Sequence, residues 1–324
     1  MGYNSSVYKK IYDEYSGKYL IARQKADERT REIRTRFPEI AEIDRRLASV
    51  GLEIFSASLS GPDYRVRLAE VRAKNETLQA MRAEALEKHG YPADYTDVHY
   101  ECKKCGDTGF IDNRMCSCMK EALVLAGIES SGFASHIREQ SFESFSLEYY
   151  MKNPSHAEMM RRNRDFLYKY ATEFSATGSP SILLMGGTGL GKTHLSSAVA
   201  GKVIEGGADV FYTGAIDLFS QFEIQRFKSY SNEPNELIER YFEADLLIVD
   251  DLGTELANQF SVSTLYNLIN DRLSRKKPTI ISTNLSRDEI QKRYTDRITS
   301  RLLGEYTVLL FMGTDIRAQK LMKN

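Results

Sequence analysis

The chain has 324 residues, of which 42% are hydrophobic and 27% charged, and its formal net charge is −1. This length predicts about two domains, and the globular composition excludes a chain that is disordered throughout. The near-neutral charge argues against a uniformly basic surface, although it is compatible with a local nucleic-acid-binding patch. There is no apolar N-terminal segment and no uncharged apolar run of about 18 residues, so we expect no membrane span, no secretory signal and a cytoplasmic protein.

Residues 1–90 show the apolar spacing that is typical of helices. Pro38 suits the first turn of a helix, and apolar residues follow it at alternating intervals of three and four. These residues are Ile40, Ile43, Leu47, Val50 and Ile54. A third helix is expected to end near Lys88, with Gly90 as its stop. Its inward-facing residues are expected to be Val71, Leu78 and Met81. These apolar stripes predict an ordinary helical core. A partner-binding surface on the same helices is compatible with that interpretation.

The four cysteines of the chain lie close together, as Cys102, Cys105, Cys116 and Cys118. In a cytosolic protein such clustering indicates metal binding rather than disulfide bonds. Four thiolates suit tetrahedral Zn²⁺ and leave no open coordination position, so we expect a structural zinc site. An iron–sulfur cluster, or His99 as a substitute ligand, are the alternatives. Residues 91–135 are therefore predicted to be a zinc-binding segment that ends in a linker at Ser130-Ser131-Gly132.

From residue 136 to residue 324, short apolar runs alternate with helical patterns, which predicts an α/β domain with a parallel sheet. Five runs are expected to be its strands: 181–185, 209–213, 246–250, 279–283 and 308–312.

A glycine-rich loop stands between the first of these strands and a predicted helix. It consists of Gly186, Gly187, Thr188, Gly189, Leu190, Gly191, Lys192 and Thr193. The pattern G-x-x-x-x-G-K-[ST] in this context predicts a phosphate-binding loop, in which backbone N–H groups and a helix N-terminus surround the phosphates. Lys192 is expected to bridge the β- and γ-phosphates, and Thr193 is expected to bind Mg²⁺.

Two carboxylates follow the apolar run 246–249, at the end of a strand where open α/β sheets bind ligands. Asp250 is expected to hold Mg²⁺, and Asp251 to polarise the attacking water as general base. Glu255 is an alternative base. Asn284 ends the next strand and is expected to position the water, although an asparagine there also suits a turn.

Arginines recur near the end of the chain. Arg293, Arg297 and Arg301 are spaced by four residues and are predicted to share a helix face, and Arg317 follows the last predicted strand. A guanidinium that reaches a neighbour's nucleotide stabilises charge in the transition state of phosphoryl transfer. A solvated basic face is the alternative interpretation.

Aromatic and basic residues are interleaved between the second and third strands. They are Phe219, Phe222, Arg226, Phe227, Lys228 and Tyr230. Such a mixture suits base stacking and phosphate neutralisation on single-stranded DNA. The alternative interpretation places the phenylalanines in the core.

The ordered segments SFESFSLEYY, GGTGLGKT, LLIVDDLG, TIISTN and DRITSRLLGE resemble the AAA+ ATPases of the bacterial replicative helicase loader family, of the DnaC/DnaI type. The resemblance implies an AAA+ P-loop fold with a five-stranded parallel sheet, preceded by the helical region and the zinc-binding segment. It also implies that a full helical lid is lacking, because only 11 residues follow Gly313.

The same resemblance implies an ATPase that uses ATP and Mg²⁺. It assigns Lys192 and Thr193 to Walker A, Asp250 to Walker B, Asp251 to the catalytic acid position, Asn284 to sensor 1, Arg301 to the arginine finger and Arg317 to sensor 2. The missing lid leaves the place of Arg317 open.

The implied partners are a hexameric DnaB-type helicase, bound by residues 1–90, and single-stranded DNA, bound by the ATPase domain. Self-association or a helicase-bound ring is also implied. The alternatives are a transposition helper ATPase of the IstB type, and a nucleotide-dependent adaptor with little turnover.

Overall fold

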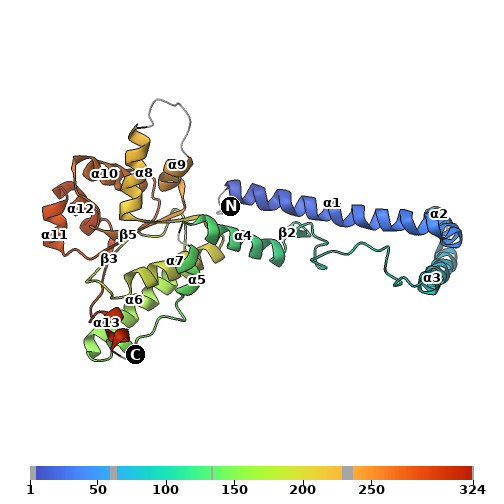
Figure 1. Cartoon of the computed structure of the whole chain (residues 1–324), viewed down its shortest axis with the longest axis horizontal. Coiled ribbons are helices and arrows are strands. Elements are labelled where there is room, and N and C mark those ends of the chain that lie inside the picture. Colours follow the sequence, from blue (N-terminus) through green and yellow to red (C-terminus); the bar gives the residue numbers. More distant parts are fainter. Residues whose placement is uncertain (1–4, 59–63, 133, 228–235, 323–324) are drawn as a thin grey trace. The chain divides into compact units, whose positions relative to one another are not determined.

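The structure is a computed structural model that describes residues 5–58, 64–132, 134–227 and 236–322 (Figure 1). The chain divides into two compact units. One, here the N-terminal unit, is Tyr12–Met119, and the other, the larger unit, is Met1–Ile11 with Lys120–Asn324. Within the described ranges, no helix combines the length and apolar character needed to cross a lipid bilayer.

The helices α1 (Ser5–Arg36), α2 (Pro38–Ser58) and α3 (Tyr64–Lys88) account for most of the N-terminal unit. Pro38 begins α2, as predicted, because its missing N–H has no partner to lose in a first turn. Ile40, Ile43 and Val50 are buried and Leu47 packs beside them, whereas the side chain of Ile54 lies outside the described residues. The seam predicted on α2 is therefore confirmed as far as its side chains are described.

The buried face of the third helix agrees with two of the three residues expected there. Leu78 is buried and Val71 packs against its cluster, but Met81 is 42% exposed, so its predicted inward position is wrong. Leu86, eight residues after Leu78, is the residue that completes the buried face. The helix ends as predicted at Gly90, whose φ is +83°.

The end of α3 is a Schellman motif. The backbone N–H of Tyr91 donates to Leu86 O at 3.0 Å and that of Gly90 to Glu87 O at 2.9 Å. These two bonds satisfy carbonyls that the end of a helix leaves without partners, and the left-handed backbone at Gly90 makes them possible.

A buried carboxylate joins the three helices. Asp44 of α2 accepts from Arg34 Nε of α1 at 2.7 Å and from Arg82 Nε of α3 at 2.6 Å. Arg82 also donates to Thr96 Oγ1 at 2.8 Å, which extends the network to the segment after α3. A buried charge of this kind persists only when it is paired, so the network fixes the register of the three helices.

The larger unit contains a five-stranded parallel sheet, and all five predicted strands are confirmed. They are β3 (Ile182–Met185), β4 (Val210–Gly214), β5 (Leu246–Leu252), β6 (Thr279–Thr283) and β7 (Thr307–Leu310), in the order β4-β5-β6-β3-β7. The first four strands are almost wholly buried, because helices cover both faces of the sheet.

Helices form a layer on each side of this sheet (Figure 1). In chain order the helices are α4 (Ser117–Ser130), α5 (Ala134–Glu139), η2 (Glu148–Tyr150), α6 (Pro154–Thr172), α7 (Lys192–Glu205), α8 (Ala215–Phe227), α9 (Glu236–Glu243), α10 (Gln259–Ser274), α11 (Arg287–Arg293), α12 (Asp296–Gly304) and α13 (Ile316–Leu321). Leu184 of β3 packs with α6 and α7, whereas the next residue back, Leu183, packs with α8, α10 and α12. This alternation is that of a three-layer α/β sandwich.

A fully buried arginine ties one side of the larger unit together. The guanidinium of Arg272, on α10, donates to Thr279 Oγ1 at 2.9 Å and to Pro278 O at 2.7 Å. It also donates to three carbonyls at the C-terminal end of α9, those of Tyr241, Phe242 and Ala244, at 3.1 Å each. Burial lowers the pKa of Arg272 to about 10, so the group keeps its charge at neutral pH.

We therefore expect Arg272→Met to lower the free energy of unfolding by about 3–5 kcal/mol, because several buried acceptors lose their donor together. Urea unfolding followed by circular dichroism measures the loss. Arg275→Met is the matched control, since Arg275 is half exposed and pairs with Glu243 and Asp271 at the surface. Its expected cost is below about 1 kcal/mol. Equal losses in both variants would contradict the role given to Arg272.

The segment predicted as a linker is packed against the edge strand β4. The N–H of Tyr212 donates to Ser131 O at 2.8 Å, and Arg240 Nη1 donates to Ser130 O at 2.6 Å. Ser131 is buried, and Gly132 adopts a φ of +91° where a Cβ would lie 2.7 Å from Tyr212 O. Residues 130–132, here called the strap, are thus held to the larger unit by one backbone bond to β4 and one bond from the side chain of Arg240.

Candidate functional site

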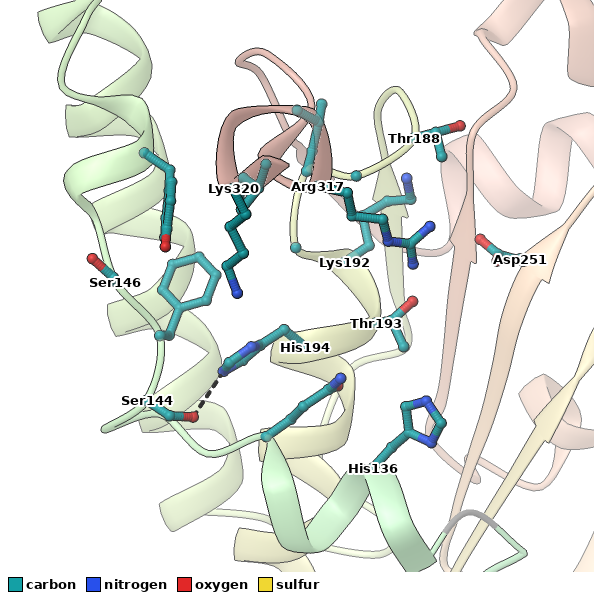
Figure 2. Close-up of a pocket in the computed structure, with 17 residues that line it drawn as sticks. His136, Ser144, Ser146, Thr188, Lys192, Thr193, His194, Asp251, Arg317 and Lys320 are labelled. Carbon is teal, nitrogen blue, oxygen red and sulfur yellow. Dashed lines mark hydrogen bonds between the residues drawn. The ribbon is translucent and has the colours of Figure 1, made fainter. Parts of the chain in front are cut away.

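A pocket lies where the strands of the larger unit end, and the phosphate loop forms its floor. Figure 2 shows Lys192, Thr193, Asp251 and Arg317 directed toward the same space. The loop follows β3, Asp251 comes from β5, and Arg317 comes from α13. Residues that are far apart in the sequence therefore meet at one site.

The loop needs glycine where it turns most tightly. Gly189 has a φ of +72° and its hydrogen occupies a place where a Cβ would collide with the carboxylate of Asp315. Its carbonyl accepts from the N–H of Ile316 at 3.0 Å, which holds α13 against the loop. A side chain at this position would separate the two segments.

The loop is folded around the head of Lys192. The Nζ atom donates to Gly186 O at 2.7 Å and to Gly187 O at 2.8 Å. Only 5% of the surface of Lys192 is exposed. Burial lowers the pKa of the Lys192 ammonium. The sequence predicted a phosphate-binding cation here, and the structure places it inside the loop.

Thr193 and Asp250 face each other at the start of α7 and near the end of β5. Thr193 Oγ1 donates to Asp250 Oδ2 at 2.8 Å, and Asp250 is buried. A hydroxyl and a carboxylate are the hard oxygen ligands that Mg²⁺ takes beside nucleotide phosphates. The two side chains thus fit the cation site expected of them.

Asp251 lines the pocket with its backbone in the left-handed region, at a φ of +55°. Burial raises the pKa of its carboxyl, and the negative charge of Asp250 raises that pKa further. A carboxylate with a raised pKa is a better general base than an ordinary aspartate. Glu255 is the less suitable base, because its carboxylate accepts from Gly253 N at 2.8 Å and from Tyr294 Oη.

Asn284 is exposed directly after β6. Strand β6 lies between β5 and β3, and Thr283 is in register with Leu252 and Met185. Asn284 therefore lies between the end of β5, which carries the two aspartates, and the end of β3, which leads into the phosphate loop. The described residues that line the pocket do not include it.

The three arginines predicted to share a helix face are not all on one helix: Arg297 and Arg301 lie one turn apart on α12, as predicted, but Arg293 does not. The helical hydrogen bonding stops at Tyr294, where ψ is 168°, and α12 starts afresh at Asp296. Arg293 ends α11 and binds the carbonyl of Glu255, whereas Arg297 and Arg301 belong to α12.

Arg301 lies outside the nucleotide pocket. Its guanidinium is 5.5 Å from the ring centre of Tyr266 on α10, beside a shallow depression that Arg297 and Ser300 also line. Arg317 has the opposite placement, since it lines the pocket of its own chain (Figure 2). It reaches the pocket from the first turn of the short helix α13.

One wall of the pocket was missed by the motif search. It consists of His136, Gln140, Ser144, Phe145, Ser146, Tyr149, His194, Ile316 and Lys320. His194 Nε2 is 2.8 Å from Ser141 O and 3.2 Å from Ser144 Oγ, and its ring meets Phe145 edge-on. Such a mixed aromatic and polar wall suits a flat heterocycle beside the phosphate loop. Four of these residues belong to the segment SFESFSLEYY, but nothing in the sequence connects that segment with the phosphate loop.

The four cysteine sulfurs converge in the N-terminal unit. All four Sγ atoms lie within 4.8 Å of one another, with Cys102 and Cys116 at 3.9 Å and Cys105 and Cys118 at 3.6 Å. Tetrahedral zinc with Zn–S bonds of about 2.3 Å places its sulfurs about 3.8 Å apart. The arrangement therefore fits Zn²⁺, and His99 is not one of the grouped ligands.

Local turns hold the cysteines in place. Asp107 accepts from the N–H groups of Glu101 at 2.9 Å and Cys102 at 2.7 Å, and Gly106 N donates to Cys102 O at 2.9 Å. The second pair follows the hairpin of β1 (Phe110–Ile111) and β2 (Arg114–Met115), whose two turn residues both have positive φ. These turns bring the two cysteine pairs together.

The residues predicted to contact DNA are only partly described. Phe219 is buried and Phe222 packs against Tyr241, so these two belong to the core. Arg226 lies 5.3 Å from the ring centre of Phe260. The side chain of Phe227, and Lys228 and Tyr230 entirely, lie outside the described residues.

A family model of known proteins matches part of the larger unit. Residues 171–319 match the model of the family described as IstB-like ATP binding protein. The chain is 24% identical over 152 residues to the replicative helicase loader DnaC of Escherichia coli strain K12, which is 47% of this chain and 61% of DnaC. The chain thus spans less than two thirds of that relative.

A second relative is covered further. The chain is 27% identical over 213 residues to the phage-like element PBSX protein XkdC of Bacillus subtilis strain 168, which is 60% of this chain and 76% of XkdC. The crystal structure of the DnaC helicase loader is similar with a TM-score of 0.49 and 18% identity, over 55% of this chain and 100% of the other.

Proposed function

From the premise that residues 171–319 are an IstB-like ATP-binding domain, homologous to a replicative helicase loader, we propose that this protein is an ATP-dependent loader of a DnaB-type replicative helicase. It would place the helicase on single-stranded DNA at the start of replication, in the cytoplasm. The observation that carries the ATPase part is the convergence of Lys192, Thr193, Asp251 and Arg317 on one pocket.

Each of these side chains has a part in the proposed hydrolysis. Lys192 and the loop amides would bind the β- and γ-phosphates, and Thr193 with Asp250 would hold Mg²⁺, which would withdraw charge from the phosphates. Asp251 accepts the proton of the attacking water, which Asn284 orients. Arg317 binds the phosphates of the nucleotide in the pocket of its own chain.

We assign Arg301 to a neighbouring subunit's site. It is half buried on α12 and lies outside the pocket of its own chain, so it reaches a nucleotide only across a contact with another molecule. This placement predicts weak turnover by the isolated monomer and stimulation by assembly with the helicase or by DNA.

The N-terminal unit is the proposed helicase-binding part, with the cysteine cluster as a structural zinc site. It exposes apolar side chains that a helical core does not require, notably Leu20 and Ile21 of α1, which are 64% and 53% exposed. Exposed apolar groups on a stable helix favour a protein partner.

The runner-up is a transposition helper ATPase of the IstB type. The family model that matches residues 171–319 favours it equally in the ATPase domain. The two proposals differ in partner, because the runner-up would bind a transposase and duplex DNA. A nucleotide-dependent adaptor with little turnover is the third proposal.

Binding to the replicative helicase of the same genome tests the function. We expect the full chain to retain the helicase in a pull-down and, with ATP, to load it on circular single-stranded DNA. The double substitution Leu20→Glu, Ile21→Glu is expected to weaken retention at least about tenfold, because charge on a buried contact opposes association. Met151→Glu, at an equally exposed apolar site in the larger unit, is the control.

The possible results separate the proposals. Retention that the double substitution reduces, and that Met151→Glu does not, supports the loader. A full chain that hydrolyses ATP but fails to bind the helicase contradicts the loader and favours the transposition helper. Nucleotide binding without turnover, even with helicase and DNA present, favours the adaptor.

A further inference from the structure

The pairing between β5 and β6 is interrupted beside the two acidic residues. Val249 is in register with Ile281 and Leu252 with Thr283, so Asp250 and Asp251 together stand opposite the single residue Ser282. Two residues opposite one define a β-bulge. A bulge leaves a backbone group of the longer strand without its ladder partner, so something else has to satisfy it.

The hydroxyl of Ser282 fills that place. Ser282 Oγ accepts from the backbone N–H of Asp251 at 2.9 Å and donates to Asp250 Oδ1. Ser282 has no exposed surface, so water does not substitute for either bond. One hydroxyl therefore contacts both acidic residues, the first through its carboxylate and the second through its backbone.

Both contacts bear on the direction of a carboxylate. The remaining oxygen of Asp250, Oδ2, accepts from Thr193, so the Asp250 carboxylate is held between a hydroxyl on each side. Asp251 has a φ of +55°, a backbone region that costs free energy for a residue with a Cβ and persists only when surrounding bonds hold it. In this backbone conformation the side chain of Asp251 lines the pocket.

We propose that Ser282 is a positioning residue of the hydrolytic centre: its hydroxyl orients the Asp250 carboxylate toward the cation and holds Asp251 in the left-handed turn that presents its carboxylate to the water. This inference rests on the proposed ATPase function. Ser282 itself touches neither nucleotide nor water, and acts through the two aspartates.

Ser282→Ala tests the inference in the full-length protein. Loss of hydrogen bonds to a charged group and to a buried N–H predicts a fall in kcat of about tenfold to a hundredfold. The KM for ATP should change less than about threefold, because Lys192 and the loop amides remain in place. Ser282→Thr retains the hydroxyl and should recover most of kcat.

A second readout does not depend on turnover. Binding of a fluorescent ATP analogue is measured with Mg²⁺ and with EDTA, and the ratio of the two affinities reports the cation site. Because Ser282 and Thr193 hold the Asp250 carboxylate between them, Ser282→Ala should reduce this ratio at least about threefold, whereas affinity in EDTA should stay unchanged.

Ser181→Ala is the matched control. Ser181 is buried immediately before β3, at the opposite end of the sheet, and its hydroxyl accepts from Thr279 N at 3.1 Å. Like Ser282→Ala, Ser181→Ala removes a hydroxyl group and its buried hydrogen bonding, so the thermal stability of the two variants should fall comparably. Its kcat and its ratio of affinities should equal those of the unmodified protein.

The outcomes distinguish the two levels of the argument. If Ser282→Ala and Ser181→Ala lose only stability and keep kcat and the affinity ratio, the positioning role is overturned while the ATPase function stands. If the unmodified protein shows no turnover above Lys192→Ala with helicase and DNA present, the proposed hydrolysis fails. In that case an unchanged affinity ratio overturns the role of Ser282, and a reduced ratio supports it.

Discussion

Lys192→Ala should abolish measurable ATP turnover and weaken nucleotide binding at least about a hundredfold. Its ammonium is buried inside the phosphate loop and bonded to two loop carbonyls, so it supplies a desolvated positive charge where the phosphates bind. Fluorescence titration with an ATP analogue and a phosphate-release assay measure the two losses. The folded state should survive, because removal of a buried cation also removes its desolvation cost.

Lys202→Ala is the control for this prediction. Lys202 lies on the same helix, α7, but is partly exposed and pairs with Glu205 at 2.9 Å. Its removal should leave binding and turnover unchanged. If Lys192→Ala bound the nucleotide as tightly as Lys202→Ala does, the pocket described here would not be the phosphate site.

Cys102→Ser should eliminate metal binding and unfold the segment around the cysteines. The purified protein is expected to contain one Zn²⁺ per chain, measured by elemental analysis, and the variant essentially none. Because the binding free energy of a structural zinc site is folding free energy, the loss should be large, with apparent values of about 10–16 kcal/mol in zinc-finger peptides. Limited proteolysis should then cut within residues 91–119.

Ser117→Ala, between the last two cysteines, is the control and should retain the metal. A chelator should reproduce the effect of Cys102→Ser in the unmodified protein. Iron in place of zinc, with visible absorption of a cluster, would contradict the zinc assignment and favour the iron–sulfur alternative. Cys102→Ser is expected to leave the nucleotide pocket of the larger unit unchanged, even where it abolishes helicase binding.

The sheet was predictable because its strands carry their own signal. A strand buried on both faces is a continuous apolar run, and each of the five runs became a strand. The phosphate loop was equally predictable, since backbone amides can surround a phosphate only with glycine at positions such as Gly189. Lys192 and Asp251 met in one pocket because parallel strands present their carboxyl ends at one edge.

Side-chain direction was less predictable where two spacings fit the same sequence. Met81 follows Leu78 by three residues and Leu86 follows it by eight, and both intervals fall near one helical stripe. Leu86 is buried because it packs with Ile33 of α1 and Ile40 of α2, whereas Met81 stays exposed. The spacing of Arg293 and Arg301 was likewise compatible with one helix, and the break at Tyr294 has no proline or glycine to announce it.

The wall of the pocket and the role of Ser282 could not be found from sequence. Gln140, Phe145 and Tyr149 become neighbours of the phosphate loop through tertiary packing, and no short-range pattern connects them to Lys192. Ser282 looks like an ordinary strand residue. Its contacts arise from a bulge in register between two strands, which depends on both partners.

The strap has a practical consequence for anyone who divides this chain. Strand β4 is the edge strand of the sheet, and the N–H of its Tyr212 donates to Ser131 O in the strap. A fragment that begins at residue 136 lacks the strap, so β4 becomes an exposed edge strand to which a second copy can add a strand. Such a fragment would dimerise or precipitate through a contact that the whole protein does not offer. An oligomer seen only with that fragment would be an artefact of the truncation. A fragment that begins near residue 117 retains the strap on the edge strand.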